Sequence, residues 1–186
     1  MKTKGLLFGV GVGAGSGPYS AKNYPNEYKH WHSMLGRCYY YDNYKNKAIV
    51  CKEWHNFENF CNWVISNPWY GPDKHLDKDV IIKGNREYGP GVCAFIPRRI
   101  NNAFTERTKE GKILPIGVSK ASINKFKCRY YDSEGTRKHV FGFDTPEDAF
   151  KNFCLNKERV MKELAEIHKH DIDPRVYDSL INFKQD

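Results

Sequence analysis

The strongest constraint on the fold of this chain is a strand–turn–strand–helix pattern that begins at residue 126. Between residues 126 and 131 apolar and basic side chains alternate, and a period of two predicts a strand with one buried face. Turn-forming residues at 132–135 and a second strand-like run at 138–143 complete a predicted hairpin. The two faces of the first strand carry Phe126, Cys128 and Tyr130 on one side and Lys127, Arg129 and Tyr131 on the other.

A long amphipathic helix is predicted directly after the hairpin. Thr145 is a favourable N-cap, and Pro146 suits the first helical turn. Acidic residues at 147 and 148 then face the positive end of the helix dipole. Because an apolar stripe must be buried, we expect the helix to cover the apolar face of the hairpin and leave the basic face exposed. The stripe runs through Ala149, Phe150, Phe153, Met161, Leu164 and Ile167.

The positive charge of the chain is concentrated around this module. A third strand is predicted at residues 116–120, which gives a three-stranded antiparallel sheet packed on one helix. The chain has a net charge of +8, and residues 98–138 hold eleven Lys and Arg against four Asp and Glu. A localised basic excess favours a polyanionic partner, because each neutralised phosphate releases condensed counterions. Residues 171–186 are net acidic, and their apolar spacing predicts a small docked helix that could also serve dimerisation.

This module resembles an Apetala/ethylene-response-factor-type domain. The matching segments are Ile116-Gly117-Val118, the basic strand at 127–131, and the run from His139 through Gly142-Phe143 and Thr145 to Phe150. Domains of that family insert their sheet into the major groove, so the resemblance implies duplex DNA as partner. Carried over by position, the contacts fall on Lys120, Lys127, Arg129, Tyr131, Arg137 and His139, and we count Lys125, Arg98 and Arg99 with the same nucleic-acid-binding surface. An ordinary solvated sheet face is the alternative.

The N-terminal part is predicted to mix helices and short strands. Its expected elements are helices at 26–39 and 54–64, a short strand at 49–51, and a strand–turn–strand–helix unit at 73–107. The first strand of that unit should run from His75 into Val80-Ile81-Ile82. The glycine run around Gly9 and Gly11 lacks the following helix that a dinucleotide site requires, so we interpret it as a loop.

Several segments of this part resemble phage-encoded HNH-type proteins, homing-endonuclease-like proteins in which an ethylene-response-factor-type domain often follows the nuclease. The matching segments are Arg37-Cys38-Tyr39, Val50-Cys51-Lys52-Glu53-Trp54, Phe57-Glu58-Asn59-Phe60, Leu76-Asp77-Lys78-Asp79 and Gly84-Asn85, with Tyr88, Cys93, Phe95 and Ile100-Asn101-Asn102. The resemblance implies a ββα-metal module in which a His activates water and one divalent metal stabilises the transition state. We therefore expect an α+β chain with a degenerate HNH-like module followed by the sheet and its helix.

The catalytic positions of the HNH pattern are only partly kept. The resemblance puts Asp77 and Asn85 at metal-ligand positions, with Mg²⁺ as the cofactor. Lys78 stands at the general-base position, and a Lys cannot accept a proton at neutral pH unless its pKa is strongly lowered. His75 could replace it, although on a regular strand His75 and Lys78 would face opposite sides. Cys93, near the second ligand position of the helix, suits Mg²⁺ poorly.

The six cysteines are dispersed and form no C-x-x-C pair, which predicts ordinary buried thiols in a reducing compartment. A zinc site drawn from Cys38, Cys51 and nearby histidines is the alternative. No segment approaches the length of a membrane span. The predicted domains are a Gly-rich segment at 1–22, an HNH-like module at 23–110, an ethylene-response-factor-type module at 111–170 and an acidic tail helix at 171–186.

The sequence leaves three functions open. The first is sequence-biased binding of duplex DNA with metal-dependent phosphodiester cleavage. The second is DNA binding alone, by a nuclease-derived regulator or by an anti-defence protein with a host protein partner. The third is RNA or protein binding by the same basic sheet. The resemblance to phage proteins implies the cytosol of a bacterial host cell in each case.

Overall fold

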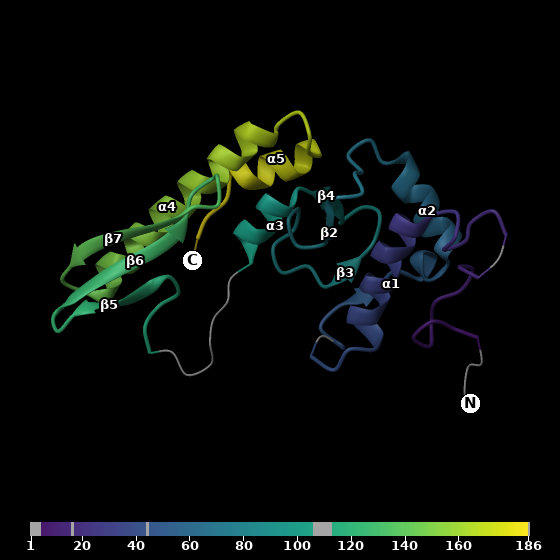
Figure 1. Cartoon of the computed structure of the whole chain (residues 1–186), viewed down its shortest axis with the longest axis horizontal. Helices are drawn as coiled ribbons and strands as arrows, with labels where there is room; N and C mark the ends of the chain where they lie inside the picture. Colours follow the sequence, from purple (N-terminus) through teal and green to yellow (C-terminus); the bar gives the residue numbers. More distant parts are fainter. Residues whose placement is uncertain (1–4, 16, 44, 106–112, 186) are drawn as a thin grey trace. The chain divides into compact units, whose positions relative to one another are not determined.

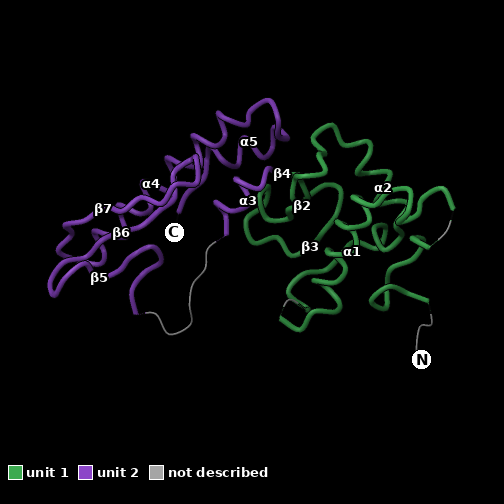
Figure 2. Tube along the Cα trace, viewed as in Figure 1, with its two compact units in different colours: residues 1–96 green, residues 97–186 purple. Residues whose placement is uncertain are grey.

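The computed structural model describes residues 5–15, 17–43, 45–105 and 113–185. As predicted, the chain is α+β, with five α-helices and a three-stranded antiparallel sheet among these residues (Figure 1). It divides into two compact units, Met1–Ile96 and Pro97–Asp186, coloured separately in Figure 2. No helix in the described ranges combines the length and the apolarity needed to cross a membrane.

The first unit is a helical core with short strand pairs. Its elements are α1 (Pro25–Tyr39), β1 (Ile49–Val50), the 3₁₀ helix η1 (Lys52–His55), α2 (Phe57–Ser66), β2 (His75–Asp77), β3 (Glu87–Tyr88) and β4 (Ala94–Ile96). β1 pairs with β3 in parallel, and β2 pairs with β4 antiparallel. The helices meet through fully buried aromatic and aliphatic side chains, and the indole of Trp31 donates to the carbonyl of Trp54 at 2.7 Å. The aromatic residues that the helical spacing assigned to the core therefore do form it.

The glycine run predicted to be a loop packs against this core. Val12 forms an isolated bridge with Asn56, just ahead of α2. A Cβ at Gly11 would lie 2.7 Å from Cδ1 of Leu35 and 2.8 Å from the Trp31 ring, so only glycine fits at this point. The described residues of the run contain no helix or named strand, which agrees with the loop interpretation.

The second unit is a sheet covered by a long helix. Its elements are α3 (Arg98–Phe104), β5 (Val118–Ser122), β6 (Lys125–Tyr131), β7 (Arg137–Phe143), α4 (Pro146–His168) and α5 (Pro174–Ile181). The strands follow the order β5-β6-β7, and α4 packs along the sheet (Figure 1). The side chain of Thr145 accepts from the amide of Asp148 at 3.1 Å, so the predicted helix start is confirmed. The predicted helix near the C-terminus is α5, which contacts α4.

The first predicted strand of residues 73–107 is shorter than expected. Strand β2 ends at Asp77, and residues 78–82 form bends instead of continuing through Val80-Ile81-Ile82. The cause is local, because the side chain of Asp77 accepts hydrogen bonds from the amides of Asp79 and Val80, both at 2.7 Å. An Asp that captures amides two and three residues ahead turns the chain and ends the ladder.

The boundary between the units precedes the predicted one. The sequence placed it between residues 110 and 111, which lie outside the described residues, whereas the structure divides the chain after Ile96. Helix α3 belongs to the second unit because Arg99 donates to the backbone carbonyls of Asp132 and Ser133 in the β6–β7 turn. Lys157 of α4 donates to the carbonyl of Ala103 at the other end of α3.

The approach of the sheet to α4 yields a stability prediction. Gly117 has φ +75°, and a Cβ there would overlap the ring of Phe153, with Cε2 only 2.6 Å away. We expect Gly117→Ala to lower the free energy of unfolding by about 3 kcal/mol, measured by urea denaturation, through overpacking added to backbone strain. Gly142→Ala is the matched control, because Gly142 has φ +94° but open space around it. Equal losses in the two variants would show that contact with Phe153 does not matter.

Candidate nucleic-acid interface

We call the surface of the sheet that faces away from α4 the open face. Three cross-strand pairs between β6 and β7 contribute to it. Strand register pairs Lys127 with Phe141, Arg129 with His139, and Tyr131 with Arg137. Directly opposed residues of an antiparallel pair share a face, so these six side chains form one ladder of cations and aromatic rings. The intervening residues of β6, Phe126, Cys128 and Tyr130, pack toward α4, as the alternation predicted.

Cations and rings of the open face contact each other along the ladder. The ammonium of Lys127 lies 5.2 Å from the centroid of the Phe141 ring, and the rings of His139 and Phe141 stack at 6.0 Å. The guanidinium of Arg137 lies 5.6 Å from the centroid of the Tyr131 ring and also donates to its hydroxyl. These contacts hold the cations over aromatic surface and leave their charge uncompensated.

The two central cations have no acidic partner. Neither Lys127 nor Arg129 forms an ion pair with a carboxylate of the described residues. The side chain of Arg129 is exposed and that of Lys127 is partly buried. The side chain of Phe141 is 61% exposed on the same face, and no other described element covers it. Such exposure is unusual for a phenylalanine. The open face therefore offers charge and apolar surface side by side.

Four of the predicted contact residues lie elsewhere. Lys120 pairs with Phe126, so the register puts it on the side of the sheet that faces α4. Lys125 forms an ion pair with Asp144. Arg98 and Arg99 lie on α3, outside the sheet, and Arg99 is occupied by the β6–β7 turn. The structure thus groups Lys127, Arg129, Tyr131, Arg137 and His139 and separates Lys120, Lys125, Arg98 and Arg99 from them.

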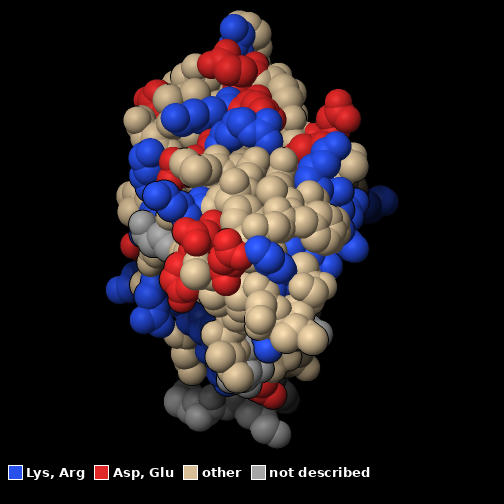
Figure 3. All heavy atoms as spheres, turned by 90° about the vertical axis from the view of Figure 1, so that its left-hand side faces the viewer, with Lys and Arg blue, Asp and Glu red and all other residues tan. Residues whose placement is uncertain are grey.

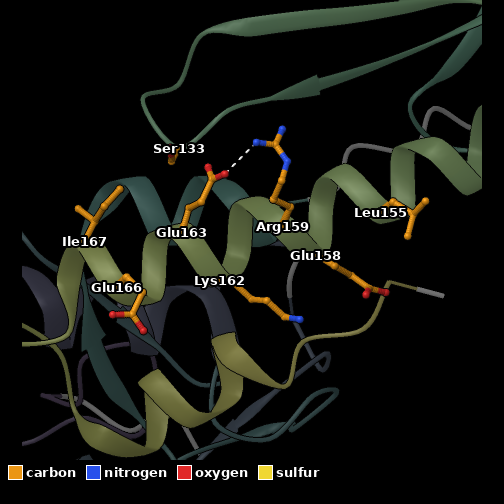
Figure 4. A pocket seen from close by; sticks show the side chains of 8 residues that line it. All are labelled: Ser133, Leu155, Glu158, Arg159, Lys162, Glu163, Glu166 and Ile167. Atoms are coloured by element: carbon orange, nitrogen blue, oxygen red, sulfur yellow. Dashed lines mark hydrogen bonds and ion pairs between the residues drawn. The ribbon is translucent and has the colours of Figure 1, made fainter.

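The helix side of the second unit has a different electrostatic character. A groove there is lined by Ser133, Leu155, Glu158, Arg159, Lys162, Glu163, Glu166 and Ile167 (Figure 4). Three of the lining residues are glutamates, and Arg159 is paired with Glu163 at 2.8 Å. The face shown in Figure 3 likewise interleaves acidic and basic side chains around uncharged surface. A polyanion is therefore attracted to the open face of the sheet more strongly than to this groove.

In the first unit, the predicted metal ligands hold a loop together. One carboxylate oxygen of Asp77 accepts the two amides that end β2. The amide nitrogen of Asn85 donates to the carbonyls of Lys78 and Glu87 at 2.8 and 2.7 Å, and its oxygen accepts from the amide of Glu87. Asp77 and Asn85 thus act on the backbone at the two ends of one loop.

Lys78 is held inside the same loop. Its ammonium contacts both carboxylate oxygens of Asp79, at 2.6 and 2.7 Å, and the carbonyl of Asn85 at 2.6 Å. All three donors are used, so this Lys is a bound cation and not a base. His75 lies in β2 close to His30 of α1, and burial together with the charge of His75 lowers the pKa of His30.

These residues do not fit a Mg²⁺ ion. Mg²⁺ requires an octahedron of oxygen ligands, usually including carboxylates with free lone pairs. Burial raises the pKa of Asp77, the amides of Asp79 and Val80 already occupy one of its oxygens, and a Lys ammonium stands within the loop. Within the described ranges, no three His, Cys, Asp or Glu side chains are grouped so that they could hold a metal, and this includes Cys38 and Cys51.

Two relevant residues were missed by the sequence reasoning. Phe141 lies two residues after His139, which itself lies two residues after Arg137, so all three side chains share one face of β7. The same alternation in the sequence would therefore have placed Phe141 on the open face. Arg37 was noticed only as part of a resemblance, but its guanidinium lies 5.6 Å from the centroid of the Tyr88 ring. Because α1 and β3 are far apart in sequence, no local pattern pointed to that contact.

Comparison with known proteins adds no relative to this description. No protein-family model, no curated protein and no solved structure matched the chain.

The position of Asp77 leads to a pH prediction. Burial raises the pKa of this carboxyl in the folded protein. Ionising Asp77 in the folded protein therefore costs free energy. The free energy of unfolding of the wild type falls as pH rises from the ordinary Asp pKa of about 3.9 through the raised pKa, and it stays lower above that. Asp77→Asn keeps an oxygen for the two amides without the charge, so its stability relative to the wild type should rise over that interval and then stay constant in urea denaturation.

Asp77→Ala is the companion variant. It removes the acceptor of two amide hydrogen bonds, and we expect a loss of about 1–3 kcal/mol below the ordinary Asp pKa, which becomes smaller as the wild-type carboxyl ionises. Adding Mg²⁺ should shift the thermal midpoints of the wild type and of Asp77→Asn equally. A Mg²⁺-dependent stabilisation confined to the wild type would show that Asp77 is a metal ligand after all.

Proposed function

We propose that this protein binds duplex DNA through the open face of its three-stranded sheet. The observation that carries the proposal is the pair of unpartnered cations, Lys127 and Arg129, set between exposed rings on a face that no described element covers. A strand pair is narrow enough to enter the major groove, which is about 12 Å wide. The resemblance of this module to ethylene-response-factor-type domains implies the same mode of binding.

Each residue type on the open face has a distinct use in such a complex. The exposed guanidinium of Arg129 can donate two hydrogen bonds to N7 and O6 of a guanine, the commonest specific contact to a base edge. Phe141 offers apolar surface of the kind that contacts a thymine methyl group. The cations of Lys127 and Arg137 lie over the rings of Phe141 and Tyr131, and they can bind phosphate oxygens of the DNA backbone. Sequence bias would then come from Arg129 and Phe141, and affinity from all the cations.

For the first unit, we favour a structural and binding role over cleavage. Descent from an HNH-type nuclease rests on the sequence resemblance alone, because β2 and β4 belong to the first unit and α3 to the second. Lys78 and Asn85, at two of the catalytic positions, use their side chains to hydrogen-bond the backbone of the loop between Asp77 and Glu87. Lys78 therefore cannot act as a general base. We therefore propose a nuclease-derived DNA-binding protein, and from the resemblance alone we assign it to the cytosol of a bacterial host.

Substitution of Arg129 tests the proposed interface. We expect Arg129→Ala to weaken binding of duplex DNA by about 1–3 kcal/mol, measured by fluorescence anisotropy at several salt concentrations, because a base-edge contact is lost. Lys151→Ala is the matched control, since it removes one exposed positive charge from α4 of the same unit. If Arg129→Ala binds as the wild type does, with the same salt dependence, the open face is not the interface.

A cleavage assay separates binding from catalysis. Incubation of supercoiled plasmid with Mg²⁺ or Mn²⁺ should leave it intact at protein concentrations that saturate it, because the loop offers no general base. Metal-dependent nicking that disappears in Asp77→Ala would instead establish the nuclease. Competition by RNA that exceeds competition by duplex DNA would favour the third function that the sequence left open.

A further inference from the structure

Arg37 is a partly buried cation that has no hydrogen-bond acceptor in the described part of the chain. It lies in the last turn of α1, and its guanidinium carbon is 5.6 Å from the ring centroid of Tyr88, which is only 5% exposed. The Nε atom of Arg37 is buried and has no hydrogen-bond partner among the described residues. Buried donors in proteins are nearly always paired, and a charged donor is the costliest one to leave without an acceptor. This Nε therefore calls for an acceptor oxygen, and the positive charge of the guanidinium favours an anionic one.

A second cation stands at the same ring. The ammonium of Lys78 is 6.0 Å from the centroid of Tyr88, and its side chain is 16% exposed. Both cations reach the neighbourhood of Cys38, whose pKa is raised by burial and lowered by Arg37 and Lys78. Lys78 is neutralised by its ion pair with Asp79, so the uncompensated charge beside the Tyr88 ring is that of Arg37.

Two carboxylates of the loop that holds Lys78 are already occupied. Asp79 is held by Lys78, and Asp77 accepts the amides of Asp79 and Val80. Neither forms an ion pair with Arg37. Arg37 thus has no acceptor among the described residues, and a planar guanidinium favours a ligand with several oxygens, such as a phosphate.

We propose that Arg37, beside the Tyr88 ring, is the cation of a metal-independent phosphate-binding site in the first unit, and that its ligand is a backbone phosphate of DNA. Arg37 binds the phosphate through its charge and its hydrogen bonds, and it does not activate water. The choice of DNA as the source of the phosphate rests on the proposed function. The site itself does not, because inorganic phosphate has the same chemistry.

The first arm of the test uses inorganic phosphate and the full chain. At equal ionic strength, replacing chloride by phosphate should raise the thermal midpoint of the wild type by about 3–7 °C at a concentration roughly twenty times the dissociation constant. Arg37→Gln should lose this shift. Lys52→Gln should keep it, because Lys52 is an exposed cation of η1 in the same unit. If Arg37→Gln does not fold, Arg37→Lys keeps the charge and should weaken phosphate binding about tenfold through loss of the planar fork.

The second arm measures how DNA affinity depends on salt. Arg37→Gln should reduce the slope of log affinity against log salt by about one, with no change in Lys52→Gln, because one phosphate contact is lost. A lost phosphate shift with an unchanged DNA slope would keep the site but overturn DNA as its ligand. No phosphate-specific shift in the wild type would overturn the site. Failure of the wild type to bind DNA would overturn the proposed function, while the first arm still decides the site.

Discussion

The packing of α4 against one face of β6 is the interaction on which the second unit depends. It buries Cys128, Ala149 and Phe153, and it requires a glycine at position 117, where the backbone passes the Phe153 ring. Because a strand alternates its side chains, burying Cys128 and its even-numbered neighbours forces Lys127, Arg129 and Tyr131 to the other side. The exposure of the cations is thus a direct consequence of how the apolar face is covered, and one helix is enough to set it.

Charge is distributed so that the two sides of this unit differ. On the helix side, Arg159 is paired with Glu163 and Lys184 with Glu158. On the open face, the neighbours of the cations are aromatic rings, which attract a cation without neutralising it. The open face is suited to a polyanion because its cations lie beside rings and carry no carboxylate partner, whereas the groove on the helix side contains three glutamates.

The first unit shows how residues of a catalytic pattern can remain in place while they perform structural work. Asp77 and Asn85 bind backbone amides and carbonyls, and Lys78 closes the loop between them. A carboxylate that holds amides is a poorer metal ligand, because the same lone pairs serve both uses. The charge that stays uncompensated in this region is that of Arg37 beside Tyr88. A site of this composition suits a phosphate better than a metal ion.

The sequence alone determined the local elements of the chain. The alternation at 126–131, the turn at 132–135 and the Thr145 cap predicted β6, β7 and α4 to within a residue or two, since each signal acts over only a few positions. The class of the fold and the open placement of Lys127 and Arg129 follow from those signals. The predicted strand through Val80–Ile82 was wrong because the turn made by Asp77 outweighed the β propensity of those residues.

Only the tertiary structure decided which of these residues work together. Strand register turned Lys120 toward the helix side and brought Phe141 beside Lys127, and the bonds of Arg99 and Lys157 joined α3 to the second unit. The contact of Arg37 with Tyr88 joins positions 51 residues apart. Periodicity reports the face on which a side chain lies, whereas its partners depend on register and on packing between distant segments. That is why the elements could be predicted and their electrostatic partners could not.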